Sequence, residues 1–332
     1  MLKTLYKNNY NINDINNLVK NDLIEVQKVI DSNIGDEIPI IDDLSNHILT
    51  AGGKKIRPII TLLTSKLCDY KGKNHIALAA CVELIHTATL LHDDVIDESK
   101  LRRGLPTAND IFGNKSSVLV GDFLFSRSFE LMVQNGSKPI LKILSKTSST
   151  IAKGEVMQLA TVKNYLTDDN TYMDIIKSKT ASLFSAASEI SALLTKQQKQ
   201  IQKHLRQYGK NLGIAFQLVD DALDYIGNHE LGKKIGDDFR EGKITLPVII
   251  AISNSDNQEK KFWKKIIECD DRNEDDFNLA LNLIEKYDGI NKTMNRAIDY
   301  SNCAINSLNN FPESAYRLAL QELPKIAVNR NK

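Results

Sequence analysis

The sequence is poor in residues that interrupt helices and in cysteines that could form disulfide bonds or bind metals. Its 332 residues include only 7 prolines, 16 glycines, 4 cysteines and 1 tryptophan. Because proline and glycine are the strongest helix breakers, their scarcity permits long uninterrupted helices. The cysteines (68, 81, 269 and 303) show neither zinc-ligand nor redox spacing. Their arrangement predicts reduced thiols in a cytoplasmic protein.

A strong net charge and targeting segments are also missing. Lysine and arginine number 43 and aspartate and glutamate 42, so no overall field recruits nucleic acid or an anionic membrane. No uninterrupted apolar run approaches the roughly 20 residues that span a bilayer, so we expect no integral membrane segment. The polar, Asn-rich N-terminus is not a secretory signal. We expect residues 1–20 to be a weakly ordered lead-in to one helical domain over 21–332.

Apolar residues, 42% of the chain, recur mainly at helical spacing, and strand signals are scarce. The pattern predicts an all-α protein without internal repeats or a linker, and therefore a single domain. The segments 74–98 and 207–226 are apolar on most faces, so we expect them at the centre of a bundle. The predicted helices cover 20–33, 41–51, 57–70, 74–98, 116–135, 139–163, 170–194, 197–226, 243–254, 258–268, 274–287, 290–309 and 311–327.

Two DDxxD motifs end two of these apolar segments, in LLHDDVIDE and in FQLVDDALDY. They place carboxylates at Asp93, Asp94, Asp97, Asp220, Asp221 and Asp224. Residues four apart share a helical face, and like charges there destabilise the helix unless a cation compensates them. Magnesium accepts one or two carboxylates and completes its shell with water and phosphate. A pair of such motifs therefore predicts a diphosphate held through bridging Mg2+. A solvated acidic helix end is the alternative for either motif alone.

Two clusters of basic residues lie at positions where they could bind an anion. AGGKKIRP places Lys54, Lys55 and Arg57 at a predicted helix start, where backbone N–H groups also favour phosphate. LRRG, directly after the first acidic motif, supplies Arg102 and Arg103, and arginine binds phosphate oxygens in pairs. Each cluster alone is equally compatible with a solvated turn.

Five further residues are weaker candidates for binding diphosphate, and only the presence of the acidic and basic motifs supports them. His86 lies seven residues before Asp93 on the same face, although a lone histidine on an apolar helix is more often a core residue. The others are Lys179, Thr180, Gln217 and Lys243.

Together these motifs resemble the trans-isoprenyl diphosphate synthase (polyprenyl synthase) family. GGKKIRP, LLHDDVIDESKLRRG, GDFLFSRSFE, GEVMQL, KTASLF, FQLVDDALDY and GDDFREGKITLP match in the family's order, from about residue 44 to the C-terminal AVNR. Within the family, the bacterial octaprenyl diphosphate synthases, which make the ubiquinone side chain, are the most similar group. Lys55 stands where the family often has arginine, and the cation is retained. The first 40 residues match nothing firmly.

The resemblance implies a class I terpenoid-synthase fold, a helical bundle around a deep central cavity, in a homodimer. It implies three Mg2+ ions bridging the allylic diphosphate, held by Asp93, Asp97, Asp220 and Asp224. Positions matching its allylic-diphosphate contacts are Arg102, Lys179, Thr180, Gln217 and Lys243. Positions matching its isopentenyl-diphosphate contacts are Lys54, Arg57, His86 and Arg103. We expect catalysis to depend on both aspartate triplets and Lys179.

The expected reaction lengthens an allylic diphosphate, farnesyl diphosphate being our choice, with several isopentenyl diphosphates. Ala88 and Thr89 lie about 6–7.5 Å below Asp93 at 1.5 Å per residue, and their small side chains would let a growing tail pass. The floor would then lie deeper, at Phe129, Leu131 or Met132. We therefore expect a long all-trans product near eight isoprene units, for a quinone side chain.

Other interpretations stay open at this point. A shorter-chain geranylgeranyl synthase, or a non-catalytic regulatory subunit of a heteromeric synthase, would share most motifs. A terpene cyclase would carry a different second metal motif. A phosphohydrolase built on His92-Asp93 would not explain the second DDxxD.

Overall fold

The computed structural model describes residues 10–35, 38–50, 52–226, 235–269 and 273–329, and these residues are almost entirely helical. The helices are α1 (Ile12–Leu18), α2 (Lys20–Ile34), α3 (Pro39–Thr50), α4 (Ile56–Leu67), α5 (Asn74–Ile96), α6 (Ala108–Phe112), α7 (Asn114–Asn135), α8 (Lys138–Thr161), α9 (Asp169–Ile176), the π-helical turn η2 (Lys177–Ala181), α10 (Ser182–Leu194), α11 (Lys199–Leu223), α12 (Asp237–Arg240), α13 (Leu246–Asn254), α14 (Asn257–Glu268), α15 (Glu274–Lys286), α16 (Gly289–Asn306) and α17 (Ala315–Val328). One hairpin, β1 (Leu101–Arg102) with β2 (Leu105–Pro106), follows α5. The all-α prediction is confirmed.

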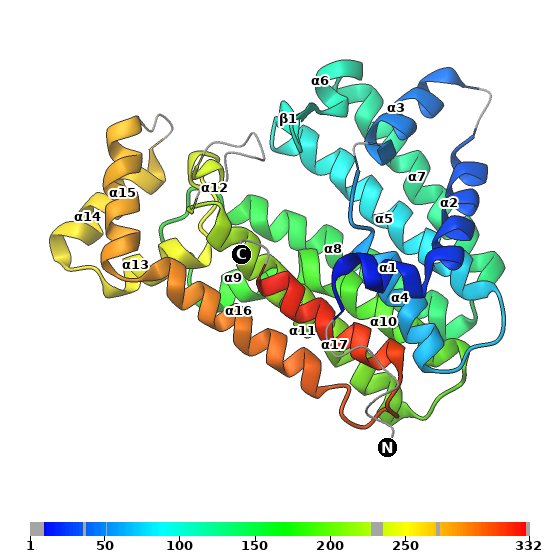
Figure 1. Cartoon of the computed structure of the whole chain (residues 1–332). Helices are drawn as coiled ribbons and strands as arrows, with labels where there is room; N and C mark the ends of the chain where they lie inside the picture. Colours follow the sequence, from blue (N-terminus) through cyan, green and yellow to red (C-terminus); the bar gives the residue numbers. More distant parts are fainter. Residues whose placement is uncertain (1–9, 36–37, 51, 227–234, 270–272, 330–332) are drawn as a thin grey trace.

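Helix α5 lies inside the bundle, as its composition predicted. It packs most extensively against α7, and α2, α4 and α10 also contact it. Leu78 and Leu84 on this helix are completely buried. In Figure 1 helices α2, α3, α5, α6 and α7 gather on one side, α11 runs beside α16 on the other, and α17 lies between α11 and α4. The C-terminal ends of α5 and α11, which carry the two acidic motifs, are thus presented from different parts of the bundle.

A second, smaller core supports the C-terminal end of α11. Trp263 of α14 is completely buried there, and its ring contacts Phe239 of α12. Phe239 also lies against Phe277 of α15. This aromatic cluster fixes the segment 237–245 beside α11, and that segment carries Asp238 and Lys243 into the site described below.

Three expectations about the elements need correction. Residues 12–18 form α1 instead of a weakly ordered lead-in, because Asn11 and Asp14 make a capping box and Ile15 is fully buried. Residues 1–9 of that lead-in lie outside the described residues. The single helix expected over 170–194 is divided by η2 into α9 and α10. Residues 307–314 separate α16 from α17.

Helix α5 also departs from the expectation of no membrane-length segment. Among the described helices it alone is long and apolar enough to cross a bilayer by length and composition. However, 67% of its most apolar 18-residue window is buried inside the fold. Burial on this scale is typical of a core helix in a water-soluble protein, and the helix ends in the first acidic motif.

Candidate active site

The first acidic motif divides its carboxylates between two directions. Asp93 and Asp97 lie four residues apart on one face of α5, and Asp94 points away from them into the fold. Asp94 is buried and accepts hydrogen bonds from Nε and Nη2 of Arg102 at 2.7–3.0 Å. This bidentate pair ties the hairpin to the end of α5. Arg103 and Gly104 both have positive φ angles, as a two-residue hairpin turn requires.

Two lysines from the opposite part of the bundle face Asp93 and Asp97. Lys179 of η2 places its Nζ atom 3.5 Å from Asp93 and 2.6 Å from Glu155 of α8. Lys243, which precedes α13, places its Nζ atom 2.8 Å from Asp97 and 2.7 Å from Glu241. The face of the first motif is therefore held near the second half of the molecule by cations, at the positions where the sequence predicted diphosphate contacts.

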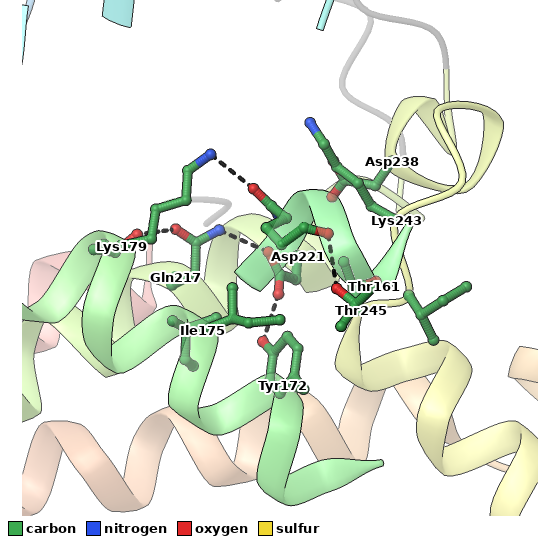
Figure 2. A pocket seen from close by; sticks show the side chains of 13 residues that line it. Thr161, Tyr172, Ile175, Lys179, Gln217, Asp221, Asp238, Lys243 and Thr245 are labelled. Carbon is green, nitrogen blue, oxygen red and sulfur yellow. Dashed lines mark hydrogen bonds between the residues drawn. The ribbon is translucent and has the colours of Figure 1, made fainter. Parts of the chain in front are cut away.

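The second acidic motif lines a small cavity on the same side. Figure 2 shows this cavity, of about 120 Å3, with Lys179, Gln217, Asp221, Asp238 and Lys243 around it. Asp221 is buried and accepts from the Tyr172 hydroxyl at 2.5 Å and from Gln217 Nε2 at 2.8 Å (Figure 2). Gln217 in turn accepts from the Thr180 hydroxyl at 2.7 Å. Asp221 is thus an internal anchor for α11, as Asp94 is for α5.

The outer carboxylates of the second motif have different surroundings. Asp220 is exposed, and its charge acts on Arg57 of α4. Asp224 accepts a hydrogen bond from the backbone N–H of Asp238 at 3.2 Å. The four predicted metal ligands therefore lie on the outer sides of their motifs, while Asp94 and Asp221 anchor them from within.

Two close helix crossings flank the π-helical turn η2. A Cβ atom on Gly154 of α8 would lie 2.6 Å from the backbone nitrogen of Lys179. One on Gly213 of α11 would lie 2.6 Å from the Cα atom of Ala181. Single π-helical turns are frequent at functional sites. Here the turn presents Lys179 to Asp93 and Thr180 to Gln217, in adjacent positions.

The glycine-lysine loop and the arginine pair also meet. A Cβ on Gly53 would lie 3.0 Å from a guanidinium nitrogen of Arg103, so the two segments are in contact. Arg57 stacks its guanidinium carbon 4.4 Å from the centre of the Phe184 ring. Its Nε is buried with no hydrogen-bond partner among the described residues. Lys54 is exposed, and Lys55 donates to Gln27 of α2.

Burial and uncompensated charge shift several pKa values in this region. Burial lowers the pKa of Arg57 to about 10, against the opposing charges of Glu83 and Asp220. Burial and the negative charge of Asp93 raise the pKa of Glu155 to about 7. Burial, with Asp238 nearby, raises the pKa of Asp221 to about 8. A lowered arginine pKa and raised carboxyl pKa values in the same region make it a candidate functional site.

The donor atoms at this site match those that magnesium prefers. Among the described residues, no three histidine, cysteine or acidic side chains converge on one point. Magnesium does not need such a cage, because phosphate and water complete its shell. Asp93, Asp97, Asp220 and Asp224 offer only oxygen donors, and the Asp93–Lys179 and Asp97–Lys243 pairs show that this face already attracts cations. The residues therefore fit a hard divalent ion.

The predicted chain-length residues fall into two groups. Ala88 is completely buried in α5, and Thr89 is partly exposed, with its hydroxyl donating to the His86 carbonyl. Leu131 and Met132 are buried on the side of α7 that faces the core. Phe129 differs from the expectation, because it lies on the outer face of α7 and is 37% exposed. Phe129 and Leu131 lie about 200° apart around the helix at 100° per residue, so they point to nearly opposite sides of α7.

A family model described as polyprenyl synthetase matches residues 38–284. The chain belongs to the polyprenyl synthetase family. The octaprenyl diphosphate synthases of Haemophilus influenzae and Escherichia coli are each 40% identical to it, over 96% and 97% of this chain and 97% and 100% of theirs. The crystal structure of a polyprenyl synthase from Caulobacter crescentus, complexed with calcium and isoprenyl diphosphate, has a TM-score of 0.93 and 44% identity. The match covers 97% of this chain and 98% of that one.

A decaprenyl diphosphate synthase from Rhodobacter capsulatus is similarly close in structure, with a TM-score of 0.92 and 42% identity over 97% of this chain and all of that one. These comparisons confirm the family resemblance that the motifs carried, and with it the class I terpenoid-synthase-like helical bundle.

Several residues of this polyprenyl synthetase site were not singled out from the sequence. Glu155 and Gln158 both contact the Lys179 ammonium group, Gln158 at 2.8 Å. They stand three apart in GEVMQL, and this i, i+3 spacing of polar residues was the available signal. Tyr172 and Glu83 had no such signal, because nothing in the sequence pairs Tyr172 with Asp221 or Glu83 with Arg57.

His86 should remain neutral at physiological pH. Burial, together with the positive charges of Arg57, Arg102 and Arg103, lowers its pKa well below 6.5. The stability that the neutral ring contributes is then present above pH 6.5 and lost as the pH falls below it. We expect the free energy of unfolding to fall from pH 6.5 to 5 more steeply in the wild type than in His86→Gln. If denaturant titrations showed the same change in unfolding free energy with pH for the two proteins, the prediction would be wrong.

Proposed function

We propose that the chain is a magnesium-dependent long-chain trans-polyprenyl diphosphate synthase. It would condense farnesyl diphosphate with several isopentenyl diphosphates to octaprenyl diphosphate, the precursor of a quinone side chain. The observation that carries the proposal is the pairing of Asp93 and Asp97 with Lys179 and Lys243 across the site. Carboxylates and lysines facing one another at this distance provide both halves of a diphosphate clamp.

Two sets of residues would bind the two diphosphate substrates. Lys179, Lys243, Arg102, Thr180 and Gln217 would hold the allylic diphosphate. When bound, three Mg2+ ions on Asp93, Asp97, Asp220 and Asp224 would neutralise its charge so that it can leave. Lys54, Arg57, His86 and Arg103 would hold isopentenyl diphosphate. The buried Arg57 Nε without a partner and the Gly53–Arg103 contact support an anion site there.

Bond formation follows from this arrangement. The double bond of isopentenyl diphosphate attacks the allylic carbon as the carbon–oxygen bond to diphosphate breaks. Apolar side chains around the allylic tail would exclude water that would otherwise quench the developing cation. A proton then leaves the new carbocation, with the departing diphosphate as its acceptor. Charge stabilisation by preorganised groups is thus the main contribution of the protein.

Incorporation of labelled isopentenyl diphosphate by the purified chain tests the proposal. We expect incorporation with farnesyl diphosphate and Mg2+, and its loss with EDTA. Activity of the chain alone excludes a regulatory subunit, and product that retains its diphosphate excludes a hydrolase or a cyclase. Failure of the chain to incorporate isopentenyl units without any partner would refute the proposal.

Product length depends on the small side chain at position 88. Phenylalanine at Ala88 would narrow the passage below Asp93, so Ala88→Phe should shorten the main product from about eight isoprene units toward the four that a single condensation with farnesyl diphosphate gives. Mass spectrometry of the products made from farnesyl diphosphate measures this. Thr89→Ser, which keeps the passage open, is the control. An unchanged product from a folded Ala88→Phe enzyme would remove Ala88 from the tunnel wall.

We also propose that the chain forms a homodimer in the cytoplasm. The outer face of α7 carries four apolar side chains that are exposed in this chain, at Val118, Leu119, Phe129 and Val133. All four lie within about 100° of one another around the helix at 100° per residue. Pairing α7 with a second copy would bury this stripe. Sedimentation equilibrium of the purified chain would test the dimer, and a monomer would contradict it.

We propose, finally, that residues 21–332 act as one catalytic domain. The proposed clamp draws on α4, α5, η2, α11 and the segment before α13, which span most of this range. The clamp residues themselves run from Lys54 to Lys243, and helices outside that range pack against the two helices that carry the acidic motifs, α2 against α5 and both α16 and α17 against α11.

A further inference from the structure

A second groove lies away from the active site, between α8, α10 and α11. It encloses about 500 Å3 and has α10 along its floor, with Ala186 and Leu193 among its apolar residues. Its walls are basic, with Lys142 and Lys146 on α8 and Arg206 on α11. The proposed reaction uses none of these residues.

The charge around this groove is one-sided. Residues 137–154 and 195–219 contain nine lysines and arginines and no aspartate or glutamate. On α10 itself the only acidic residue is Glu189, which is buried and already bound to Arg206 through two hydrogen bonds. Since the whole chain has a net charge of only +1, the remainder is net negative. The basic groups are therefore segregated and not a sign of general basicity.

Helical spacing gathers these cations into two stripes. On α8 the lysines at 138, 142, 146 and 153 fall within about 80° of arc at 100° per residue, and on α11 the cations at 199, 203, 206 and 210 fall within about 60°. Each stripe includes a residue that lines the groove. All eight lysines of the two segments are exposed, and none forms an ion pair with another described residue. They are Lys138, Lys142, Lys146, Lys153, Lys196, Lys199, Lys203 and Lys210.

We propose that this basic groove face docks the enzyme on the surface of an anionic phospholipid bilayer. Two solvated lysine stripes beside an apolar groove match a layer of phosphate headgroups over acyl chains. A bilayer is favoured over a soluble acidic partner because the product carries a hydrocarbon tail that water does not solvate. The choice of bilayer thus rests on the proposed function, whereas the charge segregation does not.

Vesicle sedimentation of the full chain, without substrates, tests the docking. We expect binding to vesicles of phosphatidylcholine and phosphatidylglycerol at 3:1, weak binding to pure phosphatidylcholine, and loss of binding in 0.5 M NaCl. The double variants Lys142→Glu/Lys146→Glu and Lys199→Glu/Lys203→Glu should each lower the partition coefficient by about tenfold or more, since each lysine near an anionic surface contributes several-fold.

The matched control changes the same charge on another helix. Lys260 and Lys264 of α14 are exposed and four residues apart, as Lys142 and Lys146 are. Lys260→Glu/Lys264→Glu should leave vesicle binding within about threefold of the wild type. Equal losses in the control and groove variants would reduce the effect to net charge and overturn the proposal.

Three further outcomes would overturn it. One is equal binding to neutral and anionic vesicles. Another is a changed sedimentation coefficient for a groove variant in solution, which would place the lysines against a second copy of the chain. The third is stronger capture by polyglutamate than by vesicles at equal charge concentration, which would indicate an acidic protein partner. Incorporation of isopentenyl units in detergent should be the same for all variants, so failure of docking and failure of the proposed catalysis are separable.

Discussion

Replacing Asp93 with asparagine should lower the rate of isopentenyl incorporation by about a thousandfold or more. The change removes the carboxylate charge of a proposed metal ligand, on the face that Lys179 approaches at 3.5 Å. Metal-ion and charge stabilisation of a leaving group is worth several kcal/mol, and each 1.36 kcal/mol changes a rate tenfold. The loss should therefore appear mainly in kcat, because stabilisation of the departing diphosphate matters most in the transition state.

The fold should tolerate this substitution. Burial raises the pKa of Asp93, against the opposing charge of Lys179, so the ionised carboxylate is less favourable inside the fold than in water. Lys179 keeps Glu155 and Gln158 as partners. We expect the melting temperature of Asp93→Asn without metal to stay near that of the wild type. Addition of Mg2+ with pyrophosphate should raise the melting temperature of the wild type much more than that of the variant.

Asp174→Asn provides the control for Asp93→Asn. Asp174 pairs with Lys177 at 3.1 Å at the end of α9, close in sequence to Lys179 but on an exposed surface. Exposed pairs of this kind contribute about 0–1 kcal/mol, so activity should be nearly unchanged. If Asp93→Asn retained more than a tenth of wild-type activity, Asp93 would not be an essential metal ligand.

The sequence was sufficient to predict the helical class, and it also proposed which groups share the site. Local patterns carried this information: the 3.6-residue period gave the helices, and the spacing within each DDxxD placed Asp93 with Asp97. Because the two motifs each end an apolar helix, the sequence predicts that they meet in one region. The contacts of Lys179 and Lys243 with the first motif agree with that inference.

Other features depended on tertiary contacts that no local pattern contains. The break of 170–194 at η2 lies where Gly154 and Gly213 on two other helices allow a close approach. The roles of Asp94 and Asp221 as buried anchors depend on Arg102 and on Tyr172, which lies 49 residues from Asp221. A DDxxD motif predicts which carboxylates share a face. It does not say which of them will find a partner inside the fold.

Alanine at Gly154 should reduce kcat about a hundredfold while leaving most of α8 intact. Alanine favours a helix over glycine by about 1 kcal/mol, so local propensity alone predicts stabilisation. However, its Cβ would lie 2.6 Å from the Lys179 nitrogen and 3.0 Å from the Lys179 Cα atom. Both are backbone atoms, so η2 itself must move, and a misplacement of about 1 Å can cost 10²-fold in rate.

The matched control for Gly154→Ala is Gly35→Ala. A Cβ on Gly35 would meet only the Asp31 carbonyl oxygen at 3.4 Å, which is ordinary contact. Steady-state kinetics should show a normal rate for this control and a reduced kcat for Gly154→Ala. Calorimetry should show a lower melting temperature for Gly154→Ala, since overpacking costs about 1–3 kcal/mol. A Gly154→Ala enzyme with wild-type kcat would mean that η2 can shift without moving the Lys179 ammonium group. In that case the contacts of that group with Glu155 and Gln158, and not the helix crossing, would fix its position.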